Sequence, residues 1–224
     1  MALPPGQTRI TGFPRFGAGA DAPPPTVPAE PVVEVAGGNP EVLAVPLSDL
    51  ADLPRREVVA DFHCVAGWTA SARRWEGIPF AAFYDAVVAR TVPAGVEITH
   101  VALTGLDGYR SVALLEDLRG DDVLLADHLD GAPLDGAHGA PLRLVSPGQY
   151  GYVNTKHLGR IELHPSEPKG RFHPSLRTHL ALALVMPHPR ARVAHEERHR
   201  YLPGRVVRPV YQRLGQALRR QTRR

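Results

Sequence analysis

Short β-prone runs, each closed by a cluster of turn-forming residues, dominate this sequence and constrain its fold more than any other feature. Clusters such as Gly37-Gly38-Asn39-Pro40 and Asp107-Gly108 separate runs rich in Val, Ile and Leu. Strands are therefore predicted at residues 32–35, 42–45, 57–65, 98–104, 109–114, 123–126, 142–145 and 159–163. Such a pattern favours a sheet-based fold over a helical bundle.

Few helices are expected within this part of the chain. Ser48 is expected to cap a short helix that ends near Pro54, and Pro79 to begin a second one. The apolar face of the second helix would carry Phe80, Phe83, Tyr84, Val87 and Val88. With no βαβ period and no Gly-rich phosphate loop of the GxGxxG or Walker type, the sequence predicts an α+β domain of mixed or antiparallel sheet.

The chain has one cysteine in 224 residues, so a disulfide framework and a zinc finger are both excluded. The fold must then rest on an ordinary apolar core, for which the 43% of hydrophobic residues suffice. No apolar run reaches the roughly 18 residues of a membrane span. The longest run is 180–186, and the N-terminus lacks the pattern of a signal peptide. We expect a soluble, cytoplasmic protein.

Charge and proline content divide the chain into three parts. Residues 1–164 carry 20 Asp and Glu against 12 Lys and Arg, whereas residues 165–224 carry 3 against 14. Ten of the 23 prolines lie in the first 46 residues. We expect a Pro-rich arm at 1–30 packing on a compact domain at 31–164, followed by a basic extension at 165–224. The acidic body disfavours nucleic-acid binding.

The basic extension contains an amphipathic segment. Apolar residues recur at helical spacing between Val206 and Leu218, with arginines around them, and Pro209 is expected to kink or begin the helix. The apolar stripe can pack on the body or on a second subunit. Docking on a partner, a membrane surface or nucleic acid is the alternative, and the scarcity of aromatic residues weakens the nucleic-acid reading.

Cys64 is the first candidate for chemistry. It lies at the end of a β-run and is followed by Val65-Ala66-Gly67, where the glycine lets the backbone turn away. Such a turn favours a side chain that projects into a cavity. The alternative is an inert, buried cysteine that behaves as a small hydrophobe.

The motif around Cys64 resembles the cysteine segment of the sulfite-oxidase-like molybdopterin-dependent oxidoreductases. The resemblance is carried by the sequences DFHCVAGW, from Asp61, and WEGIPF, from Trp75, and continues in family order over residues 31–164. The later blocks are HVALT, DGY, GAPL, GAPLRL, YGY and NTKHL. The segment from Phe13 to Gly17 resembles the family's N-terminal Phe-x-x-Phe-Gly, which lies against the cofactor.

The resemblance implies a molybdenum-molybdopterin cofactor in the sulfite-oxidase-like fold. Cys64 matches the thiolate that binds molybdenum. A soft thiolate suits this metal, and one protein sulfur is enough because the pterin dithiolene supplies two more. Tyr109 matches a wall of the substrate pocket and is assigned with Cys64 to catalysis. The residues implied to bind the cofactor are Phe13, Arg15, Phe16, His63, Cys64, Thr104, His138, Arg143, Asn154, Thr155 and Lys156. The loop 154–156 would hold the phosphate.

Several of these residues have plain alternatives from the sequence itself. Arg143 could point to solvent by strand alternation, and Lys156 is by default a surface lysine. His63 and His157 could be structural histidines, and Tyr109 could serve the core or its hairpin. The threonine of the family could instead align with Gly105, so that Thr104 would not be the matching residue.

The resemblance further implies oxygen-atom transfer on a small substrate and a separate electron-transfer partner. Basic residues precede the metal cysteine in some relatives, where this chain has Phe62 and His63, and the arginine cluster that holds sulfite is not identifiable. The substrate and the direction of reaction therefore stay open. A non-catalytic binding or scaffold protein that uses the same fold and docks by its basic tail is the rival interpretation.

Overall fold

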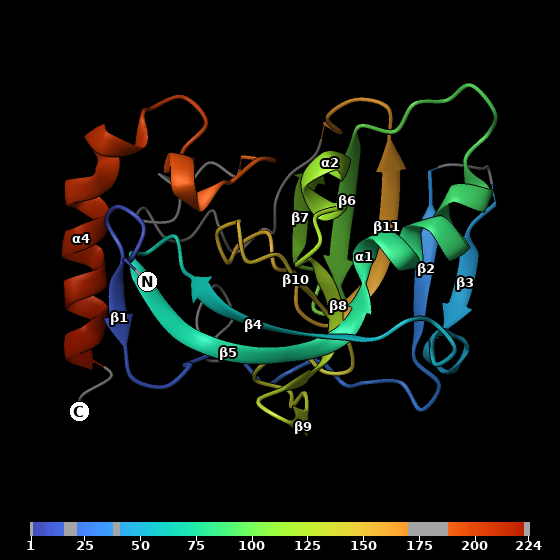
Figure 1. Ribbon diagram of the computed structural model, residues 1–224, viewed down its shortest axis with the longest axis horizontal. Helices are drawn as coiled ribbons and strands as arrows, with labels where there is room; N and C mark the ends of the chain where they lie inside the picture. Colours follow the sequence, from blue (N-terminus) through green and yellow to red (C-terminus); the bar gives the residue numbers. More distant parts are fainter. Residues whose placement is uncertain (1, 16–21, 38–40, 170–187, 222–224) are drawn as a thin grey trace.

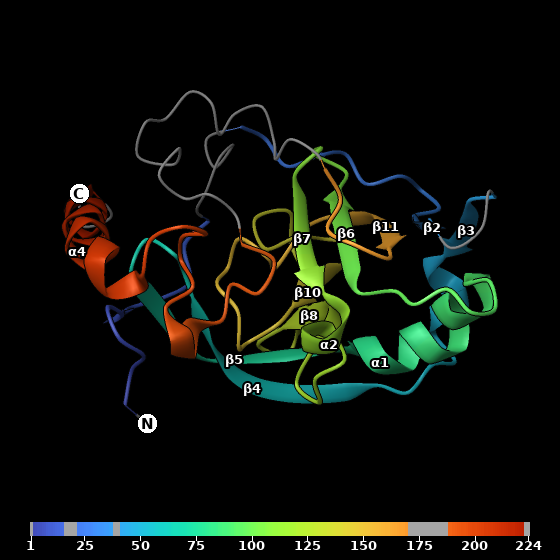
Figure 2. The same cartoon turned by 90° about the horizontal axis from the view of Figure 1, so that it is seen from above.

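Two β-sheets form the body of the protein in the computed structural model, which describes residues 2–15, 22–37, 41–169 and 188–221 (Figures 1 and 2). The first sheet has the order β1-β5-β8-β10, with β4 paired to β5 and β9 to β8. Its strands are β1 (Thr8–Ile10), β4 (Arg56–His63), β5 (Trp68–Pro79), β8 (Leu124–Leu129), β9 (Ala132–Pro133) and β10 (Arg143–Val145). Only the pairing of β1 with β5 is parallel among the pairs of this sheet.

The second sheet has the order β3-β2-β11-β6-β7. Its strands are β2 (Val32–Ala36), β3 (Leu43–Pro46), β6 (His100–Gly105), β7 (Arg110–Leu114) and β11 (Leu158–His164). The pair β2–β11 is parallel and the other three pairs are antiparallel. In Figure 1 the long strands β4 and β5 of the first sheet run across the direction of this second sheet. The α+β class with mixed sheets is thus confirmed.

The helices are short, apart from one in the C-terminal extension. They are α1 (Phe80–Phe83), α2 (Leu115–Leu118) and α4 (Gly204–Gln221). A π-helical turn, Tyr84–Val88, and a 3₁₀ turn, Ala89–Thr91, continue α1, and further 3₁₀ turns lie at Leu47–Leu50 and Val193–His195. Across the described residues, no helix has the length and apolar character needed to cross a membrane.

The main core lies between the two sheets. Val33, Leu103 and Ile161 reach it from the second sheet, and Ile78 and Leu125 from the first. Burial of these branched side chains on both sides is the chief stabilising term for the body. The helix predicted after Pro79 closes one end of this core, with Phe80 and Phe83 fully buried.

Three sequence predictions differ from the structure. Strand β5, from Trp68, was not predicted, because its run lacks a clear alternation and gains its stability by pairing with β1, β4 and β8. Ser48 does not cap a helix: it lies inside the 3₁₀ turn, and its hydroxyl donates to Asp49. Pro209 does not begin α4 but lies within it, so one of the two roles expected of it is wrong and the other, a kink, stays a prediction. The apolar run 180–186 lies outside the described residues.

The described part of the C-terminal extension packs on the end of the first sheet. Figure 1 shows α4 standing beside β1 at one end of the molecule. Tyr211 of α4 and Val193 form a small apolar cluster with Val65 and Tyr150, and all four are buried. The extension therefore covers the segment between β4 and β5, where Cys64 lies.

Candidate cofactor site at Cys64

Cys64 begins a tight turn that joins β4 to β5. The Gly67 amide donates to the Cys64 carbonyl at 3.0 Å, and the Cys64 amide to the Trp68 carbonyl at 2.8 Å. Gly67 adopts a φ of +90°, which favours glycine, and a Cβ there would lie 3.1 Å from the carbonyl oxygen of Gly6. The turn predicted from the glycine is present, and we refer to residues 64–67 as the Cys64 loop.

The thiol of Cys64 is buried, with 6% of the residue exposed. Its small apolar cluster contains Ala66, Trp68 and Ala70, with Phe13 and Phe62 packed against it. Burial raises the pKa of Cys64 to about 12, although a hydrogen bond from the Ala66 amide and the charges of Arg198 and Lys156 act in the opposite direction. The charges of two cations, Arg198 and Lys156, therefore act on the sulfur.

Phe13 brings the N-terminal arm to this cluster. Its ring lies 4.8 Å from that of Phe62 and makes an edge contact with Trp75 at 5.8 Å between centroids. The Phe13 carbonyl accepts from Nε2 of His138 at 2.9 Å, and the two rings are 5.0 Å apart. Phe13 and His138, which are 125 positions apart in the sequence, thus meet in the structure. Phe16 lies outside the described residues.

Arg143 is fully buried on β10, so the alternative of a solvent-facing arginine is wrong. Its nitrogens donate to the carbonyls of His138 at 2.8 Å and Asn154 at 3.3 Å, and the guanidinium lies 4.9 Å from the ring centre of Trp75. Within the described chain it forms no ion pair. Burial without a counter-charge lowers the pKa of Arg143 to about 9.

Lys156 is a second cation held away from solvent. Its Nζ donates to the Ala137 carbonyl at 2.6 Å. Burial, followed by the charges of Arg143 and Arg15, lowers the pKa of Lys156 to about 7, while Asp135 and Asp107 oppose the shift. Neither carboxylate forms an ion pair with it among the described residues. The charge of Arg15 acts on Lys156, and the Arg15 guanidinium also donates to the Ala22 carbonyl.

Gly139 explains how Arg143 and Lys156 come so close together. A Cβ at this position would lie 3.1 Å from Cβ of Lys156 and 3.2 Å from Cβ of Arg143, and its φ is +111°. The buried Arg143 and the partly buried Lys156 therefore flank a backbone segment without a side chain. Cationic groups without carboxylate partners form a receptor for an anion such as phosphate.

The side chains of Asn154 and Thr155 are engaged within the protein. Asn154 Oδ1 accepts from the Ser146 amide at 2.6 Å, and Thr155 Oγ1 lies 2.7 Å from Ser111 Oγ. They shape the loop that precedes Lys156, and in this structure any contact with a cofactor would come from their backbone.

Two further predicted residues lie close to Cys64. His63 is buried, and its Nδ1 lies 2.9 Å from Oγ1 of Thr69, while burial lowers its pKa. Tyr109 donates its hydroxyl to the Tyr152 carbonyl at 2.6 Å. Burial raises the pKa of Tyr109, with further contributions from the charges of Asp107 and Cys64.

Thr104 lines a cavity of about 250 Å³ together with Pro31, Glu34 and Arg160. Cys64, Arg143 and Lys156 do not occur among the residues that line this cavity. The neighbouring Gly105 approaches the loop of Lys156, because a Cβ there would lie 2.4 Å from the Lys156 carbonyl oxygen. Binding of the cofactor by Thr104 stays a prediction.

Two residues at this site were missed from the sequence. Gln7 donates from Nε2 to the Cys64 carbonyl at 3.1 Å, and Arg198 donates from Nη1 to the Val65 carbonyl at 2.5 Å. No local motif marks either residue, because both reach the Cys64 loop only through the folding of the two chain ends. In the described chain, no group of three His, Cys, Asp or Glu side chains is arranged to hold a metal ion.

Known proteins resemble this chain in sequence and in fold. The family model of the oxidoreductase molybdopterin binding domain matches residues 22–172. The chain is 30% identical over 162 residues to the uncharacterized oxidoreductase YuiH of Bacillus subtilis, covering 71% of this chain and 78% of that protein. It is 29% identical over 162 residues to mitochondrial sulfite oxidase of Homo sapiens, covering 61% of this chain and 29% of that protein.

Two further relatives extend the comparison. The catalytic subunit MsrP of the protein-methionine-sulfoxide reductase of Xanthomonas axonopodis is 32% identical over 139 residues, which cover 55% of this chain and 41% of that subunit. The crystal structure of the sulfane dehydrogenase SoxCD from Paracoccus pantotrophus matches with a TM-score of 0.51 at 21% identity, covering 61% of this chain and 38% of that chain. The matched region thus spans less than half the length of sulfite oxidase, MsrP and the SoxCD chain.

Proposed function

The chain belongs to the family of the oxidoreductase molybdopterin binding domain, and from this premise we propose that it transfers an oxygen atom to or from a small substrate at a molybdenum ion bound by Cys64. Its cofactor is molybdenum-molybdopterin. The observation that carries the proposal is that the buried Arg143 and the partly buried Lys156 meet at Gly139 without carboxylate ion pairs in the described chain, while the charge of Lys156 also acts on the buried thiol of Cys64.

The residues around Cys64 fit this cofactor. A pterin that carries a phosphate and a dithiolene is anionic, and Arg143 and Lys156 supply positive charge that is otherwise uncompensated. The charges of Arg198 and Lys156 act to lower the pKa of Cys64 and so favour the thiolate that binds a metal. Uncompensated positive charge is costly in an empty core and favourable beside an anionic, metal-bearing group.

We assign roles as follows. Cys64 binds the metal, Phe13 and His138 cover the pterin, Arg143 orients it, and Lys156 neutralises the phosphate. The bound cofactor supplies the two-electron chemistry of oxygen-atom exchange. Tyr109 forms a wall of the substrate site, where its bond to the Tyr152 carbonyl holds the ring in place.

A separate electron-transfer partner completes the proposal. MsrP is described as a catalytic subunit and the relative from Azospira oryzae as a subunit, which supports a function shared with another protein. We propose that an acidic redox protein docks on the outer face of α4, where Arg205 and Arg213 are exposed beside Val206 and Val210. The opposite face of α4 packs on Val65, next to Cys64.

We also propose the division of the chain into an arm at 1–30, a cofactor domain at 31–164 and an extension at 165–224. The second sheet, which begins at Val32 in β2 and ends at His164 in β11, supports the middle boundaries. Strand β1 and α4 both attach to the first sheet near the Cys64 loop, so the two flanking parts are packed against the domain.

Metal analysis of the purified protein tests the assignment of Cys64. Wild-type protein from a host that makes the cofactor should hold about one molybdenum per chain and show pterin fluorescence after denaturation, because the thiolate anchors the metal. Cys64→Ser should lose the metal. Ala70→Ser is the control, since it adds a hydroxyl to the same cluster and keeps the thiol.

Two results would contradict the assignment. Wild-type protein free of molybdenum would favour the scaffold interpretation. A metal content of Cys64→Ser equal to that of Ala70→Ser would show that the ligand is another group.

A further inference from the structure

Gln7 connects the Cys64 loop with the strand that follows it. Its Nε2 donates to the Cys64 carbonyl at 3.1 Å, and its Oε1 accepts from the Thr69 hydroxyl at 3.1 Å. The next residue, Thr8, begins β1, and its amide donates to the Gly67 carbonyl at 3.0 Å. Neither Gln7 nor Thr8 lies in the segment 22–172 that matches the family, so this support for the loop comes from outside the family match.

Thr69 extends the contact from Gln7 to His63. The two residues lie directly opposite each other on β5 and β4, and Nδ1 of His63 is 2.9 Å from Oγ1 of Thr69. Thr69 is fully buried and His63 is 8% exposed, so the bond between them is sheltered from water. A continuous chain of polar groups therefore runs from the carbonyl of Cys64 to the imidazole of the residue before it.

The hydrogen atoms in this chain have only one consistent arrangement. A carbonyl oxygen only accepts, so the NH₂ group of Gln7 faces Cys64 and its amide oxygen faces Thr69. The amide oxygen also only accepts, so it takes the single hydroxyl proton of Thr69. Oγ1 of Thr69 then accepts from His63, and the proton of the neutral imidazole has to lie on Nδ1.

The same assignment leaves Nε2 of His63 as an acceptor. Among the described residues, Nε2 has no hydrogen-bond partner, and it does not belong to the side-chain atoms that are buried without one. It therefore keeps access to solvent or to a ligand. An acceptor at this position suits an N–H or O–H donor and does not suit a phosphate oxygen, which needs the positive charge of Arg143 and Lys156.

The carbonyl of Cys64 is held on both of its lone pairs. Besides the bond from Gln7, it accepts from the Gly67 amide at 3.0 Å. A carbonyl oxygen has two lone pairs, so these two donors use its full capacity. Cys64 cannot turn about its backbone without breaking both bonds, and Gln7 supplies the one that comes from outside the loop.

We propose that Gln7 is a positioning residue that ties the Cys64 carbonyl to His63, so that the Cys64 loop is held for metal binding and neutral His63 keeps its proton on Nδ1 with Nε2 as a hydrogen-bond acceptor. The inference rests on the proposed function. Partners that hold a metal ligand in place by hydrogen bonds generally change metal affinity by about 10- to 100-fold when they are removed.

Two variants separate the two ends of the Gln7 amide. Gln7→Glu keeps an oxygen that accepts from Thr69, but the ionised carboxylate cannot donate to the Cys64 carbonyl. Thr69→Val removes the hydroxyl between Gln7 and His63 and keeps the size of the side chain. Arg9→Gln is the matched control, because Arg9 lies on the same strand β1 and its side chain donates to a serine of β5 instead of the Cys64 loop.

The first readout is the tautomer of His63 in apo-protein, measured by ¹H–¹⁵N correlation of the imidazole nitrogens. At pH 8 an ordinary imidazole is neutral, and a His63→Asn spectrum identifies the signals. The wild type, Gln7→Glu and Arg9→Gln should carry the proton on Nδ1, whereas Thr69→Val should shift it toward Nε2. A wild type with its proton on Nε2 would overturn the inference, and this measurement needs no substitution that risks the fold.

The second readout is the rate at which the holoenzyme loses molybdenum during dialysis. Gln7→Glu should lose the metal about tenfold faster than Arg9→Gln, because the Cys64 carbonyl is released on one side. Equal rates in these two variants would contradict the role of Gln7. Absence of molybdenum from the wild type would instead overturn the proposed function, and the tautomer of His63 would still be tested in the apo-protein.

Discussion

At the scale of single residues, the site is built from groups whose burial opposes their charge. Arg143 and Lys156 both have pKa values below their ordinary range because burial disfavours the cation. The pKa of Cys64 is raised for the same reason, since burial disfavours the thiolate. A phosphate beside the cations and a metal on the thiol would each restore the charged form.

The lowered pKa of Lys156, about 7, predicts a pH dependence of stability in the apo-protein. The folded-state value lies below the unfolded one of about 10.4, so between pH 7 and 8.5 the unfolded state binds more protons and stability rises with pH. The free energy of unfolding of the wild type, relative to Lys156→Met, should grow by about 1–2 kcal/mol over this window. Urea denaturation at pH 7.0 and 8.5 measures it.

Inorganic phosphate should reduce this pH dependence, because a bound anion favours protonated Lys156. The charges of Arg143 and Arg15 lower the pKa of Lys156, and those of Asp107 and Asp135 act in the opposite direction. All four groups therefore influence the protonation of Lys156. If the wild type and Lys156→Met differ in free energy of unfolding by the same amount at pH 7.0 and pH 8.5, the pKa of Lys156 is not lowered by its surroundings.

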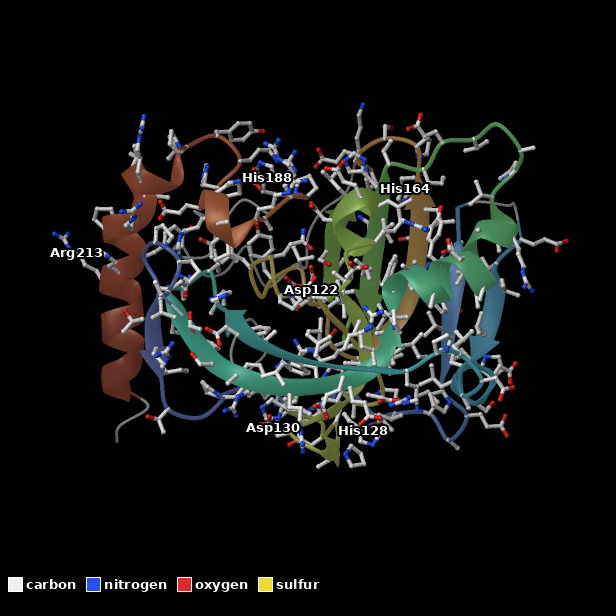
Figure 3. All side chains as sticks on the ribbon, in the orientation of Figure 1. Asp122, His128, Asp130, His164, His188 and Arg213 are labelled. Carbon is white, nitrogen blue, oxygen red and sulfur yellow. The ribbon has the colours of Figure 1, made fainter. Side chains whose placement is uncertain are left out.

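At the scale of elements, α4 differs from an ordinary surface helix in using one face for the body and leaving another apolar face exposed. Tyr211 is 3% exposed against Val65 and Tyr150, whereas Val206 is 60% and Val210 46% exposed. The inner face covers the Cys64 loop. The outer face, where Figure 3 shows Arg213 pointing away from the body, is left for a partner.

Removal of one side chain tests the docking of α4. Tyr211→Ala should lower the free energy of unfolding by about 3 kcal/mol, because it leaves a cavity beneath the helix and uncovers Arg198. Val210→Ala, the neighbouring residue on the exposed side, should change it by less than about 0.5 kcal/mol. Thermal and urea unfolding measure both, and equal effects would mean that α4 does not pack on the body through Tyr211.

At the scale of the whole molecule, charge is separated between an acidic body and a basic extension. Residues 165–224 carry 14 Lys and Arg against 3 Asp and Glu, in contrast to 12 against 20 in residues 1–164. In Figure 1 α4 lies at one end of the long axis, so the described basic surface is presented away from the second sheet. Such an asymmetric field steers an acidic partner toward that end.

A single charge reversal tests the steering. Arg213→Glu should slow electron exchange with an acidic redox protein, such as a flavodoxin, by about threefold at low ionic strength, and the difference should vanish near 0.5 M salt. Arg90→Glu, after α1 at the opposite end, is the control. Stopped-flow second-order rate constants measure the effect, and equal slowing by both variants would place the docking surface elsewhere.

The sequence by itself determined most of the strands, the class of fold and the family, and it singled out the cysteine of the candidate site. These follow from local patterns: β-prone runs between turn clusters, and ordered motifs such as DFHCVAGW and NTKHL. Strand β5 was not predicted, because the adjacent Arg73 and Arg74 interrupt the alternation of apolar and polar residues. The strand is stabilised by pairing with other strands on both of its edges.

Only the tertiary structure decided what surrounds the cysteine. Alternation left Arg143 free to face solvent, and the packing of Trp75 and Phe62 around it buried it instead. Thr104 lines a cavity with Glu34 and Arg160, which its strand pattern did not indicate. Arg198 meets Val65 across 133 positions and Pro5 across 193, and no local pattern encodes such contacts, because they form only when two chain ends close over one loop.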